Sequence, residues 1–153
     1  MHFLGRWSDR LQELGSHYGA FPAHDGLWDS ASETAHSLLA RLAIVHMVHE
    51  ARGLDVYTMS RNRLIKANDT SSCEILEKNH VEEITHVGAA VRWFKYLCDR
   101  ENIEVDPVSR FHEIVRTYFR GTLKAPFNKE SRDKAQLFEE WYMPLTMRVE
   151  PQN

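Results

Sequence analysis

The sequence has little cysteine, glycine or proline and no long apolar run, and each shortage excludes a class of protein. Its 153 residues include only 7 glycines and 5 prolines, which excludes a collagen-like chain and favours long helices. The two cysteines, Cys73 and Cys98, show no C-x-x-C spacing, so we expect reduced thiols rather than a disulfide scaffold. No apolar stretch approaches the roughly 18 residues that a membrane-spanning helix needs, so we predict no membrane partner.

An excess of charge of one sign is also absent. The 19 Lys and Arg residues against 22 Asp and Glu residues leave a formal net charge of -3. This mild acidity argues against a chain that coats nucleic acid by charge, so no nucleic-acid partner is predicted. The N-terminal residues lack the apolar core of a signal peptide, and we therefore expect a cytoplasmic protein.

Apolar residues recur at helical spacing along most of the chain, and no segment alternates as a strand does. The predicted fold class is therefore all-α. Between residues 19 and 29 we expect a loop that Phe21 and Trp28 pin to the core. The expected helices begin near residues 1, 30, 57, 71, 107 and 131 and end near residues 15, 53, 66, 98, 120 and 141.

Capping residues and glycines set these boundaries. Ser30 and Ser71 each precede a glutamate by three residues, which is typical of a capping box. Asp106 is expected to cap the helix that begins at Pro107. Gly53 is expected to end or kink the second helix, because an unbroken helix as far as residue 66 would be unusually long.

Two glutamates interrupt apolar stripes on the two longest helices. Glu50 shares a face with Ala43 and Met47, and Glu83 shares one with Val87. A carboxylate in a core stripe is costly unless it is paired or bound to a metal. An alternative interpretation is a pair of buried carboxylates satisfied by arginine, and the candidate arginines are Arg41, Arg52 and Arg92.

Histidines lie close to both glutamates in the sequence. His86 follows Glu83 in an E-x-x-H motif, and one Glu with an E-x-x-H from the next helix is half of a di-iron carboxylate pattern. His46 precedes Glu50 by one turn, so these four residues would also suit a mononuclear Zn or Mn site. A second E-x-x-H, which begins at Glu77, is offset from the apolar stripe and ranks lower.

Longer motifs resemble one known family over nearly the whole chain. They are PAHDGLW (22–28), LLARLA (38–43), HEARGLD (49–55), EEITHV (82–87), RWFKYLC (92–98) and LKAPFN (123–128). The family is the ferritin-like one catalogued as domain of unknown function number four hundred and fifty-five. The resemblance implies a ferritin-like helical bundle with a carboxylate-bridged metal site. It also implies that Glu50 is the third-helix ligand and that Glu83 and His86 are the fourth-helix pair.

The start of the chain departs from the family pattern. Full-length members have an earlier helix with a ligand glutamate, followed by another E-x-x-H before a phenylalanine. Here His2 resembles that histidine, and the glutamate three residues before it is missing. We therefore expect residues 1–153 to form a single, partial ferritin-like domain that is incomplete at its N-terminus. Residues 122–153 are expected to be a C-terminal helical extension that packs on the bundle.

These observations leave several functions open. The resemblance implies a di-iron oxidase or hydroxylase whose site is incomplete in this chain, and no motif identifies its small-molecule substrate. The cofactor expected is iron, with Zn or Mn as alternatives. The alternative function is a non-catalytic, truncated helical protein that binds no metal and forms a homo-oligomer to cover the missing helix. The candidate metal ligands are Glu50, Glu83, His86, His2 and His46.

Overall fold

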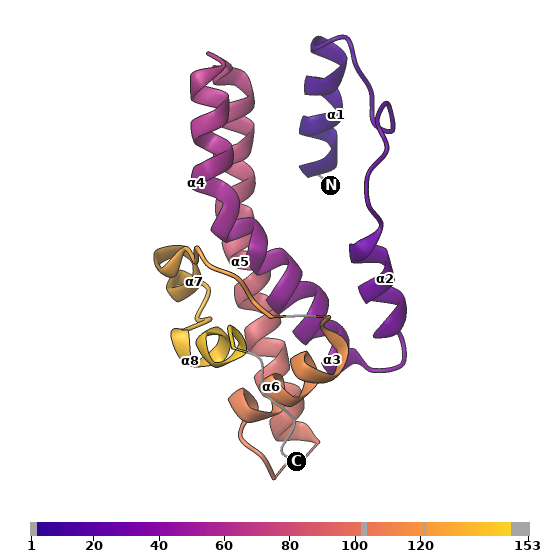
Figure 1. Cartoon of the computed structure of the whole chain (residues 1–153), viewed down its shortest axis with the longest axis vertical. Coiled ribbons are helices and arrows are strands. Elements are labelled where there is room, and N and C mark those ends of the chain that lie inside the picture. Colours follow the sequence, from indigo (N-terminus) through magenta and orange to yellow (C-terminus); the bar gives the residue numbers. More distant parts are fainter. Residues whose placement is uncertain (1–2, 102–103, 121, 148–153) are drawn as a thin grey trace.

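The computed structural model describes residues 3–101, 104–120 and 122–147 and consists of packed helices (Figure 1). No strand occurs within these ranges, so the all-α prediction is confirmed. Two long antiparallel helical segments form the axis of the molecule, and the shorter helices pack around them (Figure 1). Within the described part of the chain, no helix is both long and apolar enough to cross a membrane.

The first long segment runs without interruption from Leu38 to Lys66. It consists of α3 (Leu38–Arg41), the π-helical stretch η1 (Leu42–Glu50) and α4 (Ala51–Lys66). Of the end or kink predicted at Gly53, the end is wrong, because the helix continues to Lys66 and is held along its length by packing against α5. Its irregularity instead lies in η1, whose π-helical geometry closes backbone hydrogen bonds five residues apart.

The second long helix is α5 (Thr70–Arg100), which returns antiparallel to α4 after a tight turn (Figure 1). Asn68 makes this turn with a left-handed φ of 54°, a conformation that asparagine tolerates better than most residues. The Asp69 side chain accepts a hydrogen bond of 2.9 Å from the backbone of Ser72 and so caps the helix. The predicted cap at Ser71 is therefore wrong by two residues.

The main core lies between the two long helices and α6 (Pro107–Tyr118). Phe94, Phe111 and Trp141 pack edge to face at its centre, with ring centroids 5.5 to 6.0 Å apart. Asp106 accepts hydrogen bonds from two backbone amides at the start of α6, and Pro107 is the first residue of that helix. The predicted cap of this helix is confirmed.

The C-terminal segment packs across the long helices. It contains α7 (Lys129–Lys134), α8 (Glu139–Tyr142) and the short η2 (Met143–Leu145). The single helix predicted over residues 131–141 is wrong, because Gln136 has a φ of 60° and ends α7. α7 contacts both α4 and α5, and an added Cβ at Gly88 on α5 would lie 3.5 Å from the carbonyl oxygen of Ala135.

Two N-terminal helices complete the described fold. α1 (Phe3–Glu13) lies along α5 and is followed by a left-handed glycine, Gly15, with a φ of +72°, as predicted (Figure 1). α2 (Gly26–Glu33) begins inside the predicted loop, and the next helix is capped by Ser37 rather than by Ser30. Phe21 and Trp28 are 80% and 74% exposed, so the expectation that they pin a loop to the core is wrong.

Candidate carboxylate–histidine site

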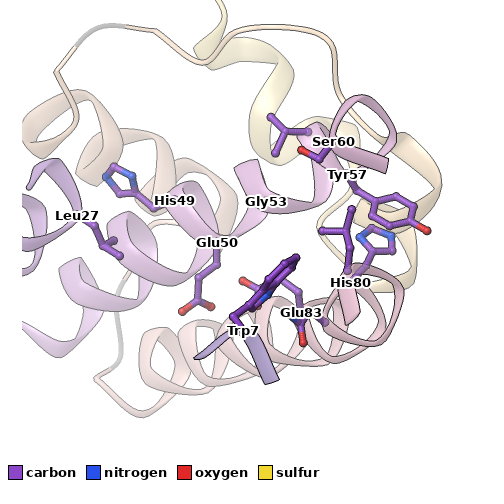
Figure 2. A pocket seen from close by; sticks show the side chains of 12 residues that line it. Trp7, Leu27, His49, Glu50, Gly53, Tyr57, Ser60, His80 and Glu83 are labelled. Atoms are coloured by element: carbon purple, nitrogen blue, oxygen red, sulfur yellow. The ribbon is translucent and has the colours of Figure 1, made fainter. Parts of the chain in front are cut away.

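Glu50 and Glu83 face one another from the two long helical segments. Glu50 is the last residue of η1 and Glu83 lies in the middle of α5. Both line the same pocket, and their side chains are 26% and 19% exposed (Figure 2). Burial raises the pKa of Glu83, and the nearby charge of Glu50 raises it further. The fold thus places two carboxylates close enough to repel each other.

Each glutamate holds a histidine from its own helix. His46 Nδ1 lies 2.7 Å from Glu50 Oε1, and His86 Nδ1 lies 3.3 Å from Glu83 Oε2. The hydrogen bond with Glu50 raises the pKa of His46 against the opposing effect of burial. We call these four residues the carboxylate–histidine site.

The first of these pairs lies within the π-helical stretch η1. His46 and Glu50 both belong to η1, four residues apart. π-Helical segments are rare and are frequent at functional sites. The sequence of residues 42–50 does not indicate this geometry, because the apolar stripe of the segment has the spacing of an ordinary α-helix.

One carboxylate oxygen of the site could accept a hydrogen bond or bind a cation but contacts neither in the described structure. Glu50 Oε2 is buried and has no hydrogen-bond partner within the described structure. A buried carboxylate oxygen without a partner is costly, and a cation would satisfy it. Carboxylate oxygens and imidazole nitrogens are also the donors that Fe, Mn and Zn accept.

The four side chains do not form a closed ligand shell as they stand. Among the described residues, no group of three or more His, Cys, Asp or Glu side chains is arranged to hold a metal ion. His86 is the outermost member, with 55% of its side chain exposed. His2, the fifth candidate ligand, lies outside the described residues.

Arginine does not neutralise either glutamate. Arg41 donates to Thr34 Oγ1 and to the carbonyl oxygen of Ala31, and Arg52 donates to the carbonyl oxygens of Lys124 and Pro126. In the described part of the chain, no hydrogen bond or ion pair joins either of these arginines, or Arg92, to Glu50 or Glu83. The alternative of arginine-satisfied carboxylates therefore finds no support.

The second E-x-x-H motif has a different environment. Glu77 accepts a hydrogen bond of 2.9 Å from Arg61 Nε at the surface. His80 lies 2.9 Å from Ser131 Oγ and stacks on Tyr57, with ring centroids 3.8 Å apart. Burial lowers the pKa of His80, and the charge of Lys134 adds to this effect. These contacts join α5 to α4 and α7, and they give both members of this motif partners outside the four residues of the carboxylate–histidine site.

The pocket beside Glu50 and Glu83 has a volume of about 390 Å³. Trp7 from α1, Val56 from α4 and Leu76 from α5 give it apolar walls, and Tyr57 and His80 lie together at one end (Figure 2). No sequence motif indicates that Trp7 lies near the two glutamates. The pocket also includes Asn79, which no motif singled out.

Comparison with known proteins agrees with the resemblance found in the motifs. The family described as "Protein of unknown function (DUF455)" matches residues 1–143. An "Uncharacterized protein" of Haemophilus influenzae is 33% identical over 128 residues, which are 84% of this chain and 44% of that protein. The chain thus spans less than half the length of this relative. No solved structure matches the chain. On the extent of both matches, the chain belongs to the DUF455 family.

Proposed function

We propose that this chain is a ferritin-like, carboxylate-type metal-binding protein that acts as an oxidase or hydroxylase. The observation that carries the proposal is the pairing of Glu50 with His46 and of Glu83 with His86 on two facing helices. The unpartnered Oε2 atom of Glu50 supports it, because this buried oxygen lacks the partner that a cation would provide.

The four side chains have distinct tasks in this proposal. Glu50 and Glu83 supply negative charge, and His46 and His86 supply imidazole nitrogen donors. A cation held by these groups would take the place of the hydrogen bond between each histidine and its glutamate, and each imidazole could keep its proton on the ring nitrogen that does not bind the cation. The apolar walls of the pocket reduce the exposure of the two carboxylates to 26% and 19%. Iron held by such a donor set supplies the activation of dioxygen.

Iron is the proposed metal, with Zn or Mn as the alternatives. Imidazole and carboxylate donors accept all three, and the ligand types alone do not select one. Metal availability and coordination geometry make that choice in a cell. The substrate would be a small molecule that reaches the pocket.

Metal analysis of protein purified without chelator tests this proposal. We expect about two metal ions per chain in the wild type, as in a di-metal carboxylate site. Glu50→Gln and Glu83→Gln remove a charge at nearly constant volume, and each should weaken binding by about tenfold or more. Glu77→Gln is the matched control, because it alters the other E-x-x-H motif and should leave binding unchanged.

Two outcomes would contradict the proposal. One is a metal content below about a tenth of an ion per chain after supply of Fe(II), Mn(II) and Zn(II) in turn. The other is equal loss of metal in Glu77→Gln and Glu83→Gln, because binding would then not depend on the carboxylate–histidine site. Circular dichroism of each variant separates loss of binding from loss of fold.

A second candidate function is a non-catalytic helical protein that forms a homo-oligomer. The exposure of Tyr18, Phe21 and Trp28 favours it, because each of these aromatic side chains is at least 74% exposed. Size-exclusion chromatography with light scattering should then give an oligomer that Phe21→Asp converts to a monomer. A wild-type monomer at high concentration would rule this function out.

A further inference from the structure

Gly53 leaves space beside the carboxylate–histidine site that its own helix does not require. A glycine inside a helix is destabilising relative to alanine, so its presence calls for a reason. Gly53 lies within α4, and an added Cβ would meet only Glu83 Cγ, at 4.0 Å. Neither backbone conformation nor close packing therefore demands glycine at this position. Gly53 lines the pocket (Figure 2), and the absence of a side chain at this position leaves space there.

The walls of this pocket suit an apolar ring. Trp7, Val56 and Leu76 line it from three different helices, and Tyr57 adds a second aromatic side chain. Its volume of about 390 Å³ lies within the range of sites that bind small molecules. An apolar ligand of this size would be removed from water on several sides.

A buried hydrogen-bond donor in the lining favours ligands that carry a hydrogen-bond acceptor. Asn79 is 4% exposed and lines the pocket. Its Oδ1 atom accepts a hydrogen bond of 2.8 Å from Arg6 Nη1, which fixes the orientation of the amide because arginine only donates. Asn79 Nδ2 is then left buried with no partner in the described structure. Such a donor favours a ligand that carries a hydrogen-bond acceptor.

In the metal-free protein the charge of the lining disfavours anions, because no cation then offsets its two carboxylates. Glu50 and Glu83 both line the pocket, and no lysine or arginine is found among its described lining residues. An anionic ligand would be repelled by two carboxylates in a partly desolvated space. A neutral ligand would meet no such penalty.

We propose that this pocket binds a neutral, mainly apolar ring compound with one hydrogen-bond acceptor, held between Trp7 and Gly53 with its acceptor toward Asn79. The proposal goes beyond the proposed function, because it concerns the ligand that the metal-free pocket takes beside Glu50 and Glu83. The acceptor pairs with the free donor of Asn79, and the ring fills the space that Gly53 leaves.

Two fluorescent probes that differ by one sulfonate test the charge and shape requirements on metal-free protein. N-phenyl-1-naphthylamine is neutral, and 8-anilino-1-naphthalenesulfonate is its anionic counterpart. We expect the neutral probe to bind at least tenfold more tightly. Gly53→Leu should weaken its binding at least tenfold without lowering the melting temperature, because leucine fills the pocket and favours the helix.

A matched pair of competitors tests the role of Asn79. 2-Acetonaphthone has a carbonyl acceptor, and 2-isopropenylnaphthalene has the same shape without the oxygen. We expect the ketone to displace the neutral probe at a roughly fivefold lower concentration, as one neutral hydrogen bond implies. Asn79→Asp keeps an oxygen for Arg6 but removes the donor, so this preference should disappear.

The proposal is overturned if the anionic probe binds as tightly as the neutral one. It is also overturned if Gly53→Leu leaves probe binding unchanged, because the probe would then sit on an exposed apolar face. Metal analysis of the same wild-type protein distinguishes the two proposals. A chain that binds the neutral probe but no metal refutes the proposed function alone, and one that binds metal but not the probe refutes this inference alone.

Discussion

Asp55 and Arg132 form a buried, bidentate ion pair that joins α4 to α7. Arg132 Nε lies 2.8 Å from Asp55 Oδ1, and Arg132 Nη2 lies 2.7 Å from Asp55 Oδ2. The two side chains are 0% and 3% exposed, and the guanidinium also stacks on Tyr142, 4.4 Å from the ring centroid. Asp55 Oδ1 accepts a further hydrogen bond from the backbone of Asn128. The pair therefore fixes the C-terminal segment to the helix that follows Glu50.

Removal of Asp55 or Arg132 should destabilise the packing of α7 on α4. We expect Asp55→Ala to lower the free energy of unfolding by about 3–5 kcal/mol, because it leaves the charge of Arg132 buried and unpaired. Urea unfolding followed by circular dichroism measures the change. Asp133→Ala removes the carboxylate of the exposed pair with Lys129 and should leave the midpoint nearly unchanged. Equal effects of the two substitutions would contradict this account.

The two glycines of the long helices should respond oppositely to a larger side chain. Gly53→Leu should raise the free energy of unfolding by roughly 0.5–1 kcal/mol, because the new side chain enters open space. Gly88→Leu should lower it by about 1–3 kcal/mol, because an added Cβ already meets Ala135 Cα at 3.6 Å. Thermal unfolding of both variants checks the contrast, and a destabilised Gly53→Leu would show that the pocket is not open at that point.

His80 should make the stability of the protein depend on pH. Burial lowers its pKa below the ordinary value of 6.5, so the folded state holds this proton less tightly than the unfolded state does. Its contribution to stability is therefore complete above pH 6.5 and declines as the pH falls through the folded pKa. An NMR titration should locate that lower pKa, and His80→Gln should reduce the loss of stability on acidification. A titration at or above 6.5 would contradict the prediction.

Two arginines should control how firmly α1 lies on α5. Arg6 bonds to Asn79, and Arg10 lies 2.9 Å from Asp69 Oδ1 and 3.0 Å from Ser72 Oγ. We expect the double variant Arg6→Ala/Arg10→Ala to be cleaved by chymotrypsin after Trp7 at least tenfold faster than the wild type, because α1 then opens locally.

Glu13→Ala is the control for this experiment. Glu13 accepts a hydrogen bond from Arg10, and in the described part of the chain no hydrogen bond or ion pair joins it to α5, so its removal should not speed cleavage. Equal rates in the double variant and the wild type would show that apolar contacts alone hold α1 in place.

The sequence predicts the helices well where packing and periodicity agree. The apolar stripes that contain Met47 and Val87 predict two long helices, and both residues are buried. The same stripes identify Glu50 and Glu83 as exceptions, and the structure brings these two residues to one pocket. The stop expected at Gly53 fails because the cost of one glycine is small beside the packing of the whole helix.

The rest of the site depends on tertiary contacts that no local pattern contains. Trp7 reaches the pocket only because α1 lies along α5, and Asn79 is left with a free donor only because Arg6 comes from α1. Phe21 and Trp28 show the opposite case, since an aromatic residue in a loop or a short helix need not be buried. Whether these residues lie inside or outside depends on the arrangement of helices, which periodicity alone does not determine.

The π-helical stretch η1 makes the site sensitive to insertions and deletions. A π-helix takes more residues per turn than an α-helix, so η1 contains surplus chain between α3 and α4. Deletion of one residue there, such as Val45, would allow ordinary α-helical geometry. The direction in which His46 and Glu50 project would then change, because each residue turns by about 100° in an α-helix and by less in a π-helix. The length of this stretch, and not only its residue types, therefore sets the direction in which Glu50 faces.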